Sequence, residues 1–352
     1  MPAPCSDALL RLVQRATGHL PSSVVPLPGG ASSRRYLRVA TPAGTVVAMV
    51  MPGAEREGAA AGAAPAGWLS APAQWPFLEV HALLRERGVR VPAVLAEDCA
   101  RGLVLLEDLG DRTLSVLVER EPALRAEVYA LAVRDLARAQ RALASLPRGS
   151  VVASGALDAT LLRWELDHFR AWALDARGLR LGEAARAEFD AVSERLARRI
   201  AAWPRVFVHR DYQSRNLMVL GGPGGGLEIA WLDFQDALLG PRAYDLATLL
   251  TDCFQDLDRP FIEARLDDYA AAAGLDRPAR DALGRELDVI AVQRKLKDAG
   301  RFVFLDRIGA DPGLLRYVAP ALARARAALE RLRDDEDMRA LARILARVIA
   351  PS

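Results

Sequence analysis

Lysine is almost absent from this sequence of 352 residues. Lys295 and Lys297 are the only lysines among its 47 basic residues, and the others are arginine. Any positive charge that a site needs before residue 295 must therefore come from a guanidinium group. Arginine can replace lysine beside an anion, but it binds with a planar, two-pronged geometry rather than as a point charge.

Long hydrophobic runs and a strong charge imbalance are also lacking. The opening residues, MPAPCSDALLRLVQRAT, contain no apolar core of signal-peptide length, and no later run approaches a membrane span. The formal net charge is +2, with no basic tract that would favour nucleic acid. Cys5, Cys99 and Cys253 lack metal-ligand spacing, and an odd number suits a reducing compartment. We therefore expect a cytoplasmic protein with neither membrane nor nucleic acid as a partner, while its oligomeric state stays open.

The first hundred residues contain patterns typical of a small sheet. The β-prone segments SSRRYLRVA and TVVAMVM flank the turn signal TPAG, and AVLAED and GLVLLEDLG are two further apolar runs. PFLEVHALLRERG has the apolar spacing of a helix, and residues 54–75 are rich in Ala, Gly and Pro, which favours a mobile loop. With 51% hydrophobic residues, the chain can bury a large core in one unit or in two lobes.

Helical periodicity dominates from about residue 113. It covers 122–146, 157–177, 182–202, 243–255, 259–273 and 276–299, followed by two Ala- and Arg-rich stretches. The exception is 205–233, which contains strand-like segments and the glycine-rich GGPGGG. These patterns predict a β-rich N-terminal lobe joined to a mainly helical C-terminal lobe.

One polar run, in VFVHRDYQSRNLMVL, lies between two apolar, β-prone runs. Phosphoryl transfer needs a carboxylate that orients a hydroxyl nucleophile, and oxygen ligands for a divalent metal ion. The pattern H-R-D-x-x-x-x-N supplies such groups as Asp211 and Asn216, and Asp233 ends the strand-like LEIAWLD. These residues could instead only satisfy loop backbone groups, but three of them in this order favour phosphoryl transfer.

With these motifs, the chain resembles the aminoglycoside and choline phosphotransferases, which share a protein-kinase-like fold. The resemblance extends through GGASSRRYLRV, VLLEDLGDRTL, VHRDYQSRNLMVL and WLDFQDALLGPRAYDLATLL. Within that family, the SSRRYLRV, DFQDALLGPRAYDL and VQRKLKDAGRFVFLDR segments are similar to those of the bacterial anomeric kinases of cell-wall amino sugars. Those enzymes phosphorylate N-acetylmuramate and N-acetylglucosamine at C1.

The resemblance implies an α+β fold of two lobes. A nucleotide-binding lobe at 1–106, with a small antiparallel sheet and one helix, is expected to precede a linker at 107–112 and a mainly helical lobe at 113–352. The backbone near Glu107 and Leu109 is expected to meet the adenine of ATP.

The resemblance also implies roles for the acidic residues of the helical lobe. Asp211 is expected to be the catalytic base, and Asn216 and Asp233 are expected to hold Mg²⁺. Asp245 looks like a buried acid that braces the catalytic loop. Asp236 could face the sugar hydroxyls or only cap a turn, and both interpretations stay open.

The sequence departs from the family where a lysine should grip the phosphates of ATP. Met49 lies near that position in TVVAMVM, so Glu79, on the following helix, loses its usual ion-pair partner. Arg35 and Arg215 are the candidates for the missing positive charge, because guanidinium can bind phosphate oxygens bidentately. Arg34 and Arg35 could instead be solvated strand residues.

Two features near the expected acceptor site have an ordinary and a functional interpretation. Trp164, His168 and Trp172 share one helical face, which could stack on a sugar ring or belong to the core. Arg294 and Lys297, in VQRKLKDAGR, could bind the lactyl carboxylate of N-acetylmuramate or lie on a solvated helix face.

The sequence therefore predicts an ATP- and Mg²⁺-dependent kinase that converts a small-molecule amino sugar into its 1-phosphate in cell-wall recycling. An aminoglycoside kinase would want an acidic acceptor pocket, whereas the acceptor segment here is mixed to basic. A choline-type kinase would need an aromatic cage, for which the Trp164 and Trp172 face is the visible candidate. The missing lysine also leaves open a nucleotide-binding pseudokinase.

Overall fold

A computed structural model describes residues 7–28, 34–51, 75–221, 225–309 and 312–348. The chain divides into two compact units. The first unit is Met1–Trp75 with Arg90–Asp111, and the second is Pro76–Val89 with Arg112–Ser352. The helix that follows Trp75 therefore groups with the second unit. The mobile loop predicted at 54–75 lies outside the described residues except for Trp75.

The first unit contains a five-stranded antiparallel sheet with the order β1-β2-β3-β5-β4. The predicted hairpin is β2 and β3, which turn between Thr41 and Gly44. The two further apolar runs form β4 and β5, joined by the short helix η1. The bounds are β1 Ser23–Pro26, β2 Arg35–Thr41, β3 Gly44–Val50, β4 Val94–Asp98, η1 Cys99–Arg101 and β5 Leu103–Glu107.

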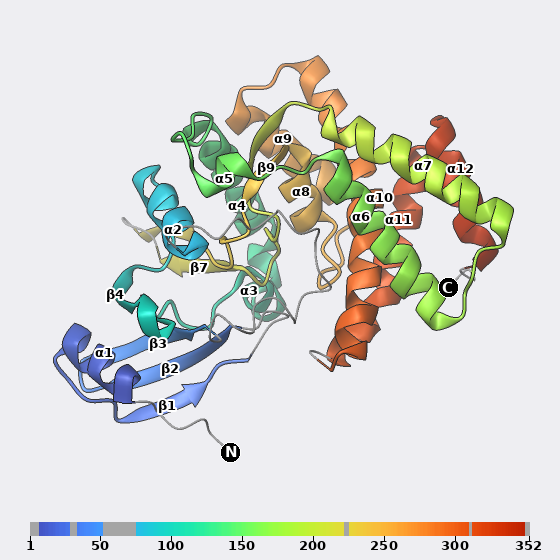
Figure 1. The fold of residues 1–352 in the computed structure, drawn as a ribbon. Helices are drawn as coiled ribbons and strands as arrows, with labels where there is room; N and C mark the ends of the chain where they lie inside the picture. Colours follow the sequence, from blue (N-terminus) through green and yellow to red (C-terminus); the bar gives the residue numbers. More distant parts are fainter. Residues whose placement is uncertain (1–6, 29–33, 52–74, 222–224, 310–311, 349–352) are drawn as a thin grey trace. The chain divides into compact units, whose positions relative to one another are not determined.

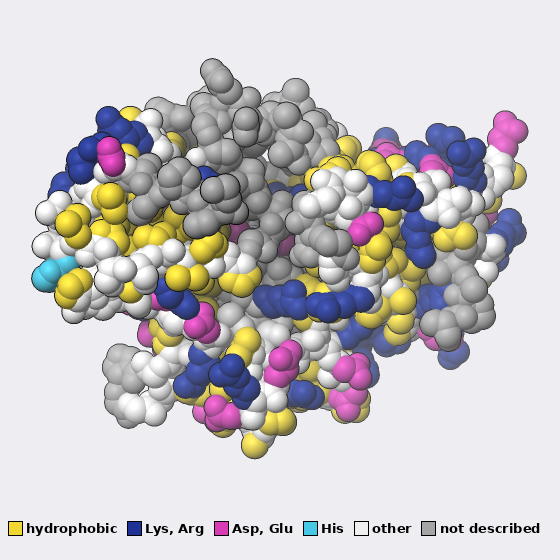
Figure 2. Space-filling view, turned by 90° about the horizontal axis from the view of Figure 1, so that it is seen from below, with side chains coloured by type: hydrophobic (Ala, Val, Ile, Leu, Met, Phe, Trp, Pro, Cys, Tyr) yellow, Lys and Arg dark blue, Asp and Glu magenta, His cyan; other side chains and the backbone are white. Residues whose placement is uncertain are grey.

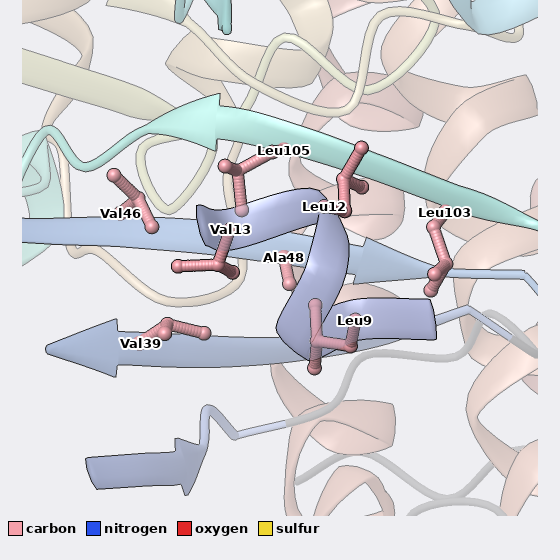
Figure 3. Packing of buried hydrophobic residues seen from close by; sticks show 8 residues of the cluster. All are labelled: Leu9, Leu12, Val13, Val39, Val46, Ala48, Leu103 and Leu105. Atoms are coloured by element: carbon pink, nitrogen blue, oxygen red, sulfur yellow. The ribbon is translucent and has the colours of Figure 1, made fainter. Parts of the chain in front are cut away.

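Helix α1, Asp7–Thr17, packs across this sheet, as Figure 3 shows. Its buried residues Leu9, Leu12 and Val13 follow the i, i+3, i+4 spacing of one helical face. They pack against strand residues that are also buried, namely Val39, Val46, Ala48, Leu103 and Leu105. The sequence analysis did not predict α1, because this segment was tested only as a targeting signal, and it did not predict the short, largely exposed β1.

The second unit contains two two-stranded sheets. Strand β6, Arg205–Val208, pairs with β9, Leu238–Pro241, and β7, Leu217–Gly221, pairs with β8, Leu227–Trp231. The sequence analysis assigned no strand to 238–241, and it placed a turn before Gly240 and Pro241. Gly240 packs closely there, since a Cβ would lie 2.6 Å from Leu157 Cδ1.

Helices make up the rest of the second unit (Figure 1). Helix α9 has the predicted bounds, whereas α10 is longer than predicted and α8 ends at Leu250 instead of 255. The shorter α8 has a local reason, because the Asp252 carboxylate accepts the Phe254 N–H and starts a turn. The helices are α2 Pro76–Glu86, α3 Leu114–Arg120, η2 Pro122–Leu124, α4 Arg125–Ala142, α5 Val151–Ser154, α6 Ala159–Phe169, η3 Arg170–Leu174, η4 Asp175–Arg177, α7 Glu183–Ala201, α8 Ala243–Leu250, α9 Arg259–Ala273, α10 Arg277–Arg307, η6 Pro312–Tyr317, α11 Val318–Arg331 and α12 Glu336–Val348.

The long helix α10 lies beside α6 and α11 in the second unit (Figure 1). Gly300 allows the approach to α6, because a Cβ at this position would lie 2.7 Å from Phe169 Cα and 3.0 Å from the His168 carbonyl oxygen. This contact fixes the position of α10 along α6, and with it the position of the charged residues of α10.

The surface carries charges of both signs. Basic and acidic side chains are both spread over the face that Figure 2 draws, in keeping with the net charge of +2. Within the described ranges, none of the helices has the length and apolar character that crossing a membrane would need.

Candidate active site

The loop that joins β6 to β7 carries the predicted catalytic residues and is braced at both ends. At its start, the buried Asp245 carboxylate accepts the N–H groups of His209 at 2.7 Å and Arg210 at 3.0 Å. Near its end, Asp252 Oδ2 accepts the N–H of Ser214 at 3.0 Å and its hydroxyl at 2.5 Å. The expectation that Asp245 braces the loop is confirmed. Such buried, charge-assisted hydrogen bonds preorganise the loop without any ligand.

The loop also holds a strained backbone conformation. Arg210 at φ +74° and Asp233 at φ +60° are the non-glycine residues with positive φ in the part of the chain that the structure describes. Such conformations cost free energy and persist where the surroundings enforce them, often at functional sites. Arg210 is fixed on both sides, because Asp245 accepts its N–H and Arg294 Nη1 donates to its carbonyl oxygen at 2.7 Å.

Arg294, on α10, binds the carboxylate of Asp211, the predicted catalytic base, directly. Its Nη2 donates to Asp211 Oδ1 at 2.8 Å, and its Nη1 donates to the Tyr244 hydroxyl at 2.8 Å. Only 3% of Arg294 is exposed, and its neighbour Lys295 is buried as well. The interpretation of this charged segment as a solvated face is therefore wrong. Its charges point inward because α10 packs under the catalytic loop.

These contacts set the ionisation of the loop. Burial alone would raise the pKa of Asp211, but Arg294, Lys297 and Arg210 lower it well below its usual range. Burial lowers the pKa of His209 to about 4, and it raises the pKa of Asp245 to about 7 despite the two N–H donors. Near neutral pH, Asp211 is therefore a carboxylate and His209 is a neutral ring.

Asn216 and Asp233 come together at the end of the β7–β8 hairpin. Leu232 N–H donates to the Asn216 carbonyl at 2.8 Å, which extends the strand pairing to the residue before Asp233. Asn216 Nδ2 donates to the Asp211 carbonyl at 2.9 Å, which commits the amide nitrogen and leaves Oδ1 as its ligand atom. Mg²⁺ takes oxygen ligands, few of them from protein when phosphates supply the others. The donor set fits such an ion.

The remaining acid of this region, Asp236, is exposed. The Gln235 side-chain amide donates to Asp233 Oδ1 at 2.9 Å and to Asp236 Oδ2 at 3.2 Å. Gln235 therefore ties the two carboxylates together and orients Asp233, a role that the sequence analysis did not assign.

The aromatic stripe of α6 is largely engaged in packing. Trp164 stacks on His168 with a ring separation of 5.3 Å, and Phe304 of α10 contacts both His168 and Trp172, at 5.4 Å and 5.0 Å. Of the stripe, His168 is buried, with 8% exposed, whereas Trp164 and Trp172 are both half-buried.

In the first unit, the predicted nucleotide-binding positions lie in or next to the strands of the sheet. Met49 is fully buried between its strand partners Tyr36 and Val104, so the apolar side chain belongs to the sheet. Arg35 begins β2 and is exposed, and Leu109 is half-buried.

The predicted linker is held by ion pairs within the first unit. The Glu107 carboxylate is bound by Arg90 at 2.6 Å. Arg38 donates to both oxygens of Asp108, at 2.7 Å and 3.0 Å, and to Asp111 at 2.9 Å. The sequence analysis missed this clamp, although Arg38 lies in the quoted SSRRYLRV segment.

Two residues with uncertain roles in the sequence have defined contacts in the second unit. The Arg215 guanidinium lies 3.6 Å from the Phe254 ring centroid and donates to the Tyr317 hydroxyl at 2.8 Å. Glu79 accepts the Val151 N–H at 2.5 Å, at the start of α5. Glu79 therefore has a structural reason to be acidic even without a lysine partner.

Asp252 is the main functional residue that the sequence analysis missed. It lies seven residues after Asp245, which is two turns of helix, so a spacing argument from YDLATLLTD would have placed both acids on one face. That signal predicts a shared neighbour but does not say that the neighbour is the loop at 209–216.

One unit has a small antiparallel sheet. The other is mainly helical and carries the braced loop with Asp211 and Asn216, followed by Asp233 at the end of a strand. These features define the class of protein-kinase-like phosphotransferases. Residues 23–283 match the model of the phosphotransferase enzyme family, and the chain belongs to this family. The predicted family, α+β fold and enzyme class are thereby confirmed.

Relatives and solved structures agree with this assignment. A protein of Pseudomonas aeruginosa named N-acetylmuramate/N-acetylglucosamine kinase is 34% identical over 321 residues, covering 86% of this chain and 85% of its own length. A protein of the same name from Pseudomonas putida is 37% identical over 248 residues, covering 69% and 68%. The solved structure of spectinomycin phosphotransferase with ADP and spectinomycin has a TM-score of 0.61 at 12% identity, covering 93% of this chain and 99% of its own. This last similarity is one of fold.

Proposed function

We propose that this phosphotransferase is an ATP-dependent kinase of amino sugars, which phosphorylates the anomeric hydroxyl of N-acetylmuramate, N-acetylglucosamine or both. The names of the two relatives support the sugar, because each match covers more than two thirds of this chain. The observation that carries the chemistry is the Asp211 carboxylate, held by Arg294 at 2.8 Å on a braced loop. Cytoplasmic location and a role in cell-wall recycling stay predictions.

In the proposed mechanism, Asp211 orients the sugar hydroxyl and accepts its proton while the oxygen bonds to the γ-phosphorus and ADP leaves. Because Arg294 lowers the pKa of Asp211, the carboxylate is a weak base toward a free hydroxyl. We therefore expect the proton to move late, when bonding to phosphorus has made the hydroxyl more acidic. Orientation is then the main contribution of Asp211, as in a loose phosphoryl-transfer transition state.

The metal ligands of the proposed mechanism are Asn216 and Asp233. When bound, Mg²⁺ supplies charge neutralisation for the phosphates. Gln235 supports this site, because its amide binds Asp233 Oδ1 and thereby orients the Asp233 carboxylate.

The test is a coupled assay of ADP release with N-acetylmuramate, N-acetylglucosamine, an aminoglycoside and choline, followed by phosphorus NMR of the product. We expect turnover with at least one amino sugar and a sugar 1-phosphate signal. The methyl glycoside of the same sugar is the control, since its C1 oxygen has no proton to transfer. Efficient ADP release with the methyl glycoside would contradict anomeric phosphorylation, and preferred turnover of choline or the aminoglycoside would contradict the amino-sugar assignment.

A further inference from the structure

Two cations of α10 lie on one face of the helix, next to the catalytic loop. Lys297 and Arg301 are four residues apart, so their side chains are neighbours on the helix surface. The close approach at Gly300 brings this part of α10 against His168 and Phe169 of α6. The pair therefore lies on the part of α10 that packs against α6, within electrostatic reach of Asp211.

The carboxylates around this pair are already bound by other cations. Asp298 accepts from Lys295 at 2.8 Å and lies 3.2 Å from Arg294 Nε, whereas Lys297 Nζ is 3.8 Å away, beyond hydrogen-bond distance. Asp211 is bound by Arg294.

The nearest carboxylate on α6, that of Glu165, is only partly bound. Its Oε2 accepts from Gln293 at 2.7 Å, whereas its buried Oε1 lies 3.9 Å from Arg210 and has no hydrogen-bond partner among the described residues. Arg301 has no carboxylate within ion-pair distance among the described residues, and its guanidinium lies 5.2 Å from the Phe304 ring centroid.

Among the described residues, this arrangement leaves Arg301 without an ion pair and Lys297 with only a 3.8 Å contact to Asp298, a carboxylate that Arg294 and Lys295 already share. The Lys297 side chain is 17% exposed, and Arg301 is half-buried. A poorly paired cation in such surroundings costs free energy, which a bound anion would recover. In keeping with this, burial lowers the pKa of both groups, and the two cations add to burial in lowering the pKa of His168 to about 4.

We propose that Lys297 and Arg301 bind the carboxylate of an acidic amino sugar, and that this pair makes the enzyme favour N-acetylmuramate over neutral N-acetylglucosamine. The inference rests on the proposed function, because the two sugars differ by the lactyl group that bears the carboxylate. The half-buried Trp164 ring, stacked on His168 of α6, offers an apolar surface for the sugar ring. Arg294 is not part of this pair, because it is committed to Asp211.

A sugar carboxylate is a better ligand for Lys297 and Arg301 than a phosphate of ATP. The charged groups that act on Lys297 are Arg294, Glu165 and Asp298 on α6 and α10, followed by Asp211. Asp211 is also the first charged group that acts on Arg301, so the pair lies near the residue proposed to orient the acceptor hydroxyl. The experiment must nonetheless separate the two anions, since phosphate and carboxylate bind the same cations.

The test compares kcat/KM for N-acetylmuramate and N-acetylglucosamine in Lys297→Met, Arg301→Gln and the double variant. We expect each single variant to lower kcat/KM for N-acetylmuramate about tenfold or more, which corresponds to ~1.4 kcal/mol. For N-acetylglucosamine we expect a change within about threefold, because the neutral sugar offers no carboxylate to lose. Arg301→Lys should keep part of the preference, since charge remains but the fork geometry does not.

The matched control is Arg285→Met, on the same helix. Arg285 is exposed and paired with Asp334, so the variant removes one positive charge about 24 Å from Arg301, at 1.5 Å per residue. We expect it to leave the sugar preference unchanged. Thermal unfolding checks that all variants are folded. If a neutral variant does not fold, the sugar preference is measured in Arg301→Lys instead.

The outcomes are distinguishable. An equal loss for both sugars, or a rise in the KM for ATP with unchanged sugar preference, would overturn the inference by assigning the cations to the fold or to the nucleotide. A wild-type enzyme that phosphorylates neither sugar would instead overturn the proposed function on which it rests. A wild-type enzyme that prefers N-acetylglucosamine, with no change in the variants, would overturn the carboxylate site alone.

Discussion

The catalytic loop of the second unit and the sheet of the first unit differ in what holds them in place, because buried charges hold the loop and apolar side chains hold the sheet. In the loop, Asp211 is held by the buried Arg294, and the backbone is held by Asp245 and Asp252. In the sheet, the position where a lysine is expected is the fully buried Met49, which pairs with Tyr36 and Val104 in neighbouring strands. One region is preorganised by buried charges, and the other by hydrophobic packing.

This difference has a consequence for phosphoryl transfer. In the proposed mechanism, the acceptor hydroxyl meets a carboxylate whose position is fixed before any ligand binds. At the strand where a lysine is expected to bind the phosphates of ATP, the first unit has the buried Met49 instead. The exposed Arg35, proposed to replace that lysine, would have to order a long side chain on binding.

The largest expected effect comes from removing the charge at the centre of the preorganised loop. We predict that Asp211→Asn lowers kcat by at least ~10²-fold, because the amide cannot accept the hydroxyl proton. Binding of Mg²⁺-ATP, measured by calorimetry, should remain. The control is Asp256→Asn, which neutralises an exposed carboxylate of the same unit and should leave kcat unchanged. Turnover of the Asp211 variant within a few-fold of wild type would remove it from the chemistry.

A smaller but more informative effect is expected from Arg294→Met, which leaves Asp211 in place without its partner. Losing an opposite charge raises the pKa of the carboxylate by ~1 unit or more. Since Asp211 acts as a carboxylate, the acid limb of the kcat profile should move to higher pH, with kcat lowered ~10-fold or more at the optimum through loss of orientation.

The pH profile separates this positioning role from a merely structural one. A variant that is only less stable would lower the amount of active enzyme without moving the acid limb. Arg294→Lys is the matched comparison, because it retains the charge and should keep the limb near its wild-type position. An unmoved limb in Arg294→Met would show that Arg294 does not set the ionisation of Asp211.

The same comparison explains what the sequence could and could not predict. The hairpin β2–β3 was predictable, because its strand propensity and its turn signal lie within a dozen neighbouring residues. The catalytic motif was predictable as a motif, since Asp211 and Asn216 are close in sequence. Both depend on local patterns.

The braces of the loop depend on distant residues and could not be derived from local patterns. Arg294 reaches Asp211 across 83 positions, and Asp252 reaches Ser214 across 38. A charged run on a long helix is usually solvated, so VQRKLKDAGR gave the wrong expectation. The inward position of Arg294 depends on the tertiary packing of α10, which a local charge pattern does not reveal.

The smallest expected effect tests the first unit, where charge is supplied without a buried partner. We predict that Arg35→Ala raises the KM for ATP about tenfold, equivalent to ~1.4 kcal/mol if KM follows binding. The KM for the sugar should change little. Arg35→Lys should recover only part of the loss, because a point charge does not reproduce a bidentate grip.

Two variants sharpen the Arg35 prediction. Arg215→Ala should affect the KM for ATP less, because the Arg215 guanidinium is committed to Phe254 and Tyr317 rather than free for phosphate. Met49→Lys should give no gain in ATP affinity and should lower the melting temperature, since a lysine there would be buried without a partner in the sheet. Unchanged ATP kinetics in Arg35→Ala together with a raised KM in Arg215→Ala would reverse the assignment and place the phosphate-binding cation in the second unit.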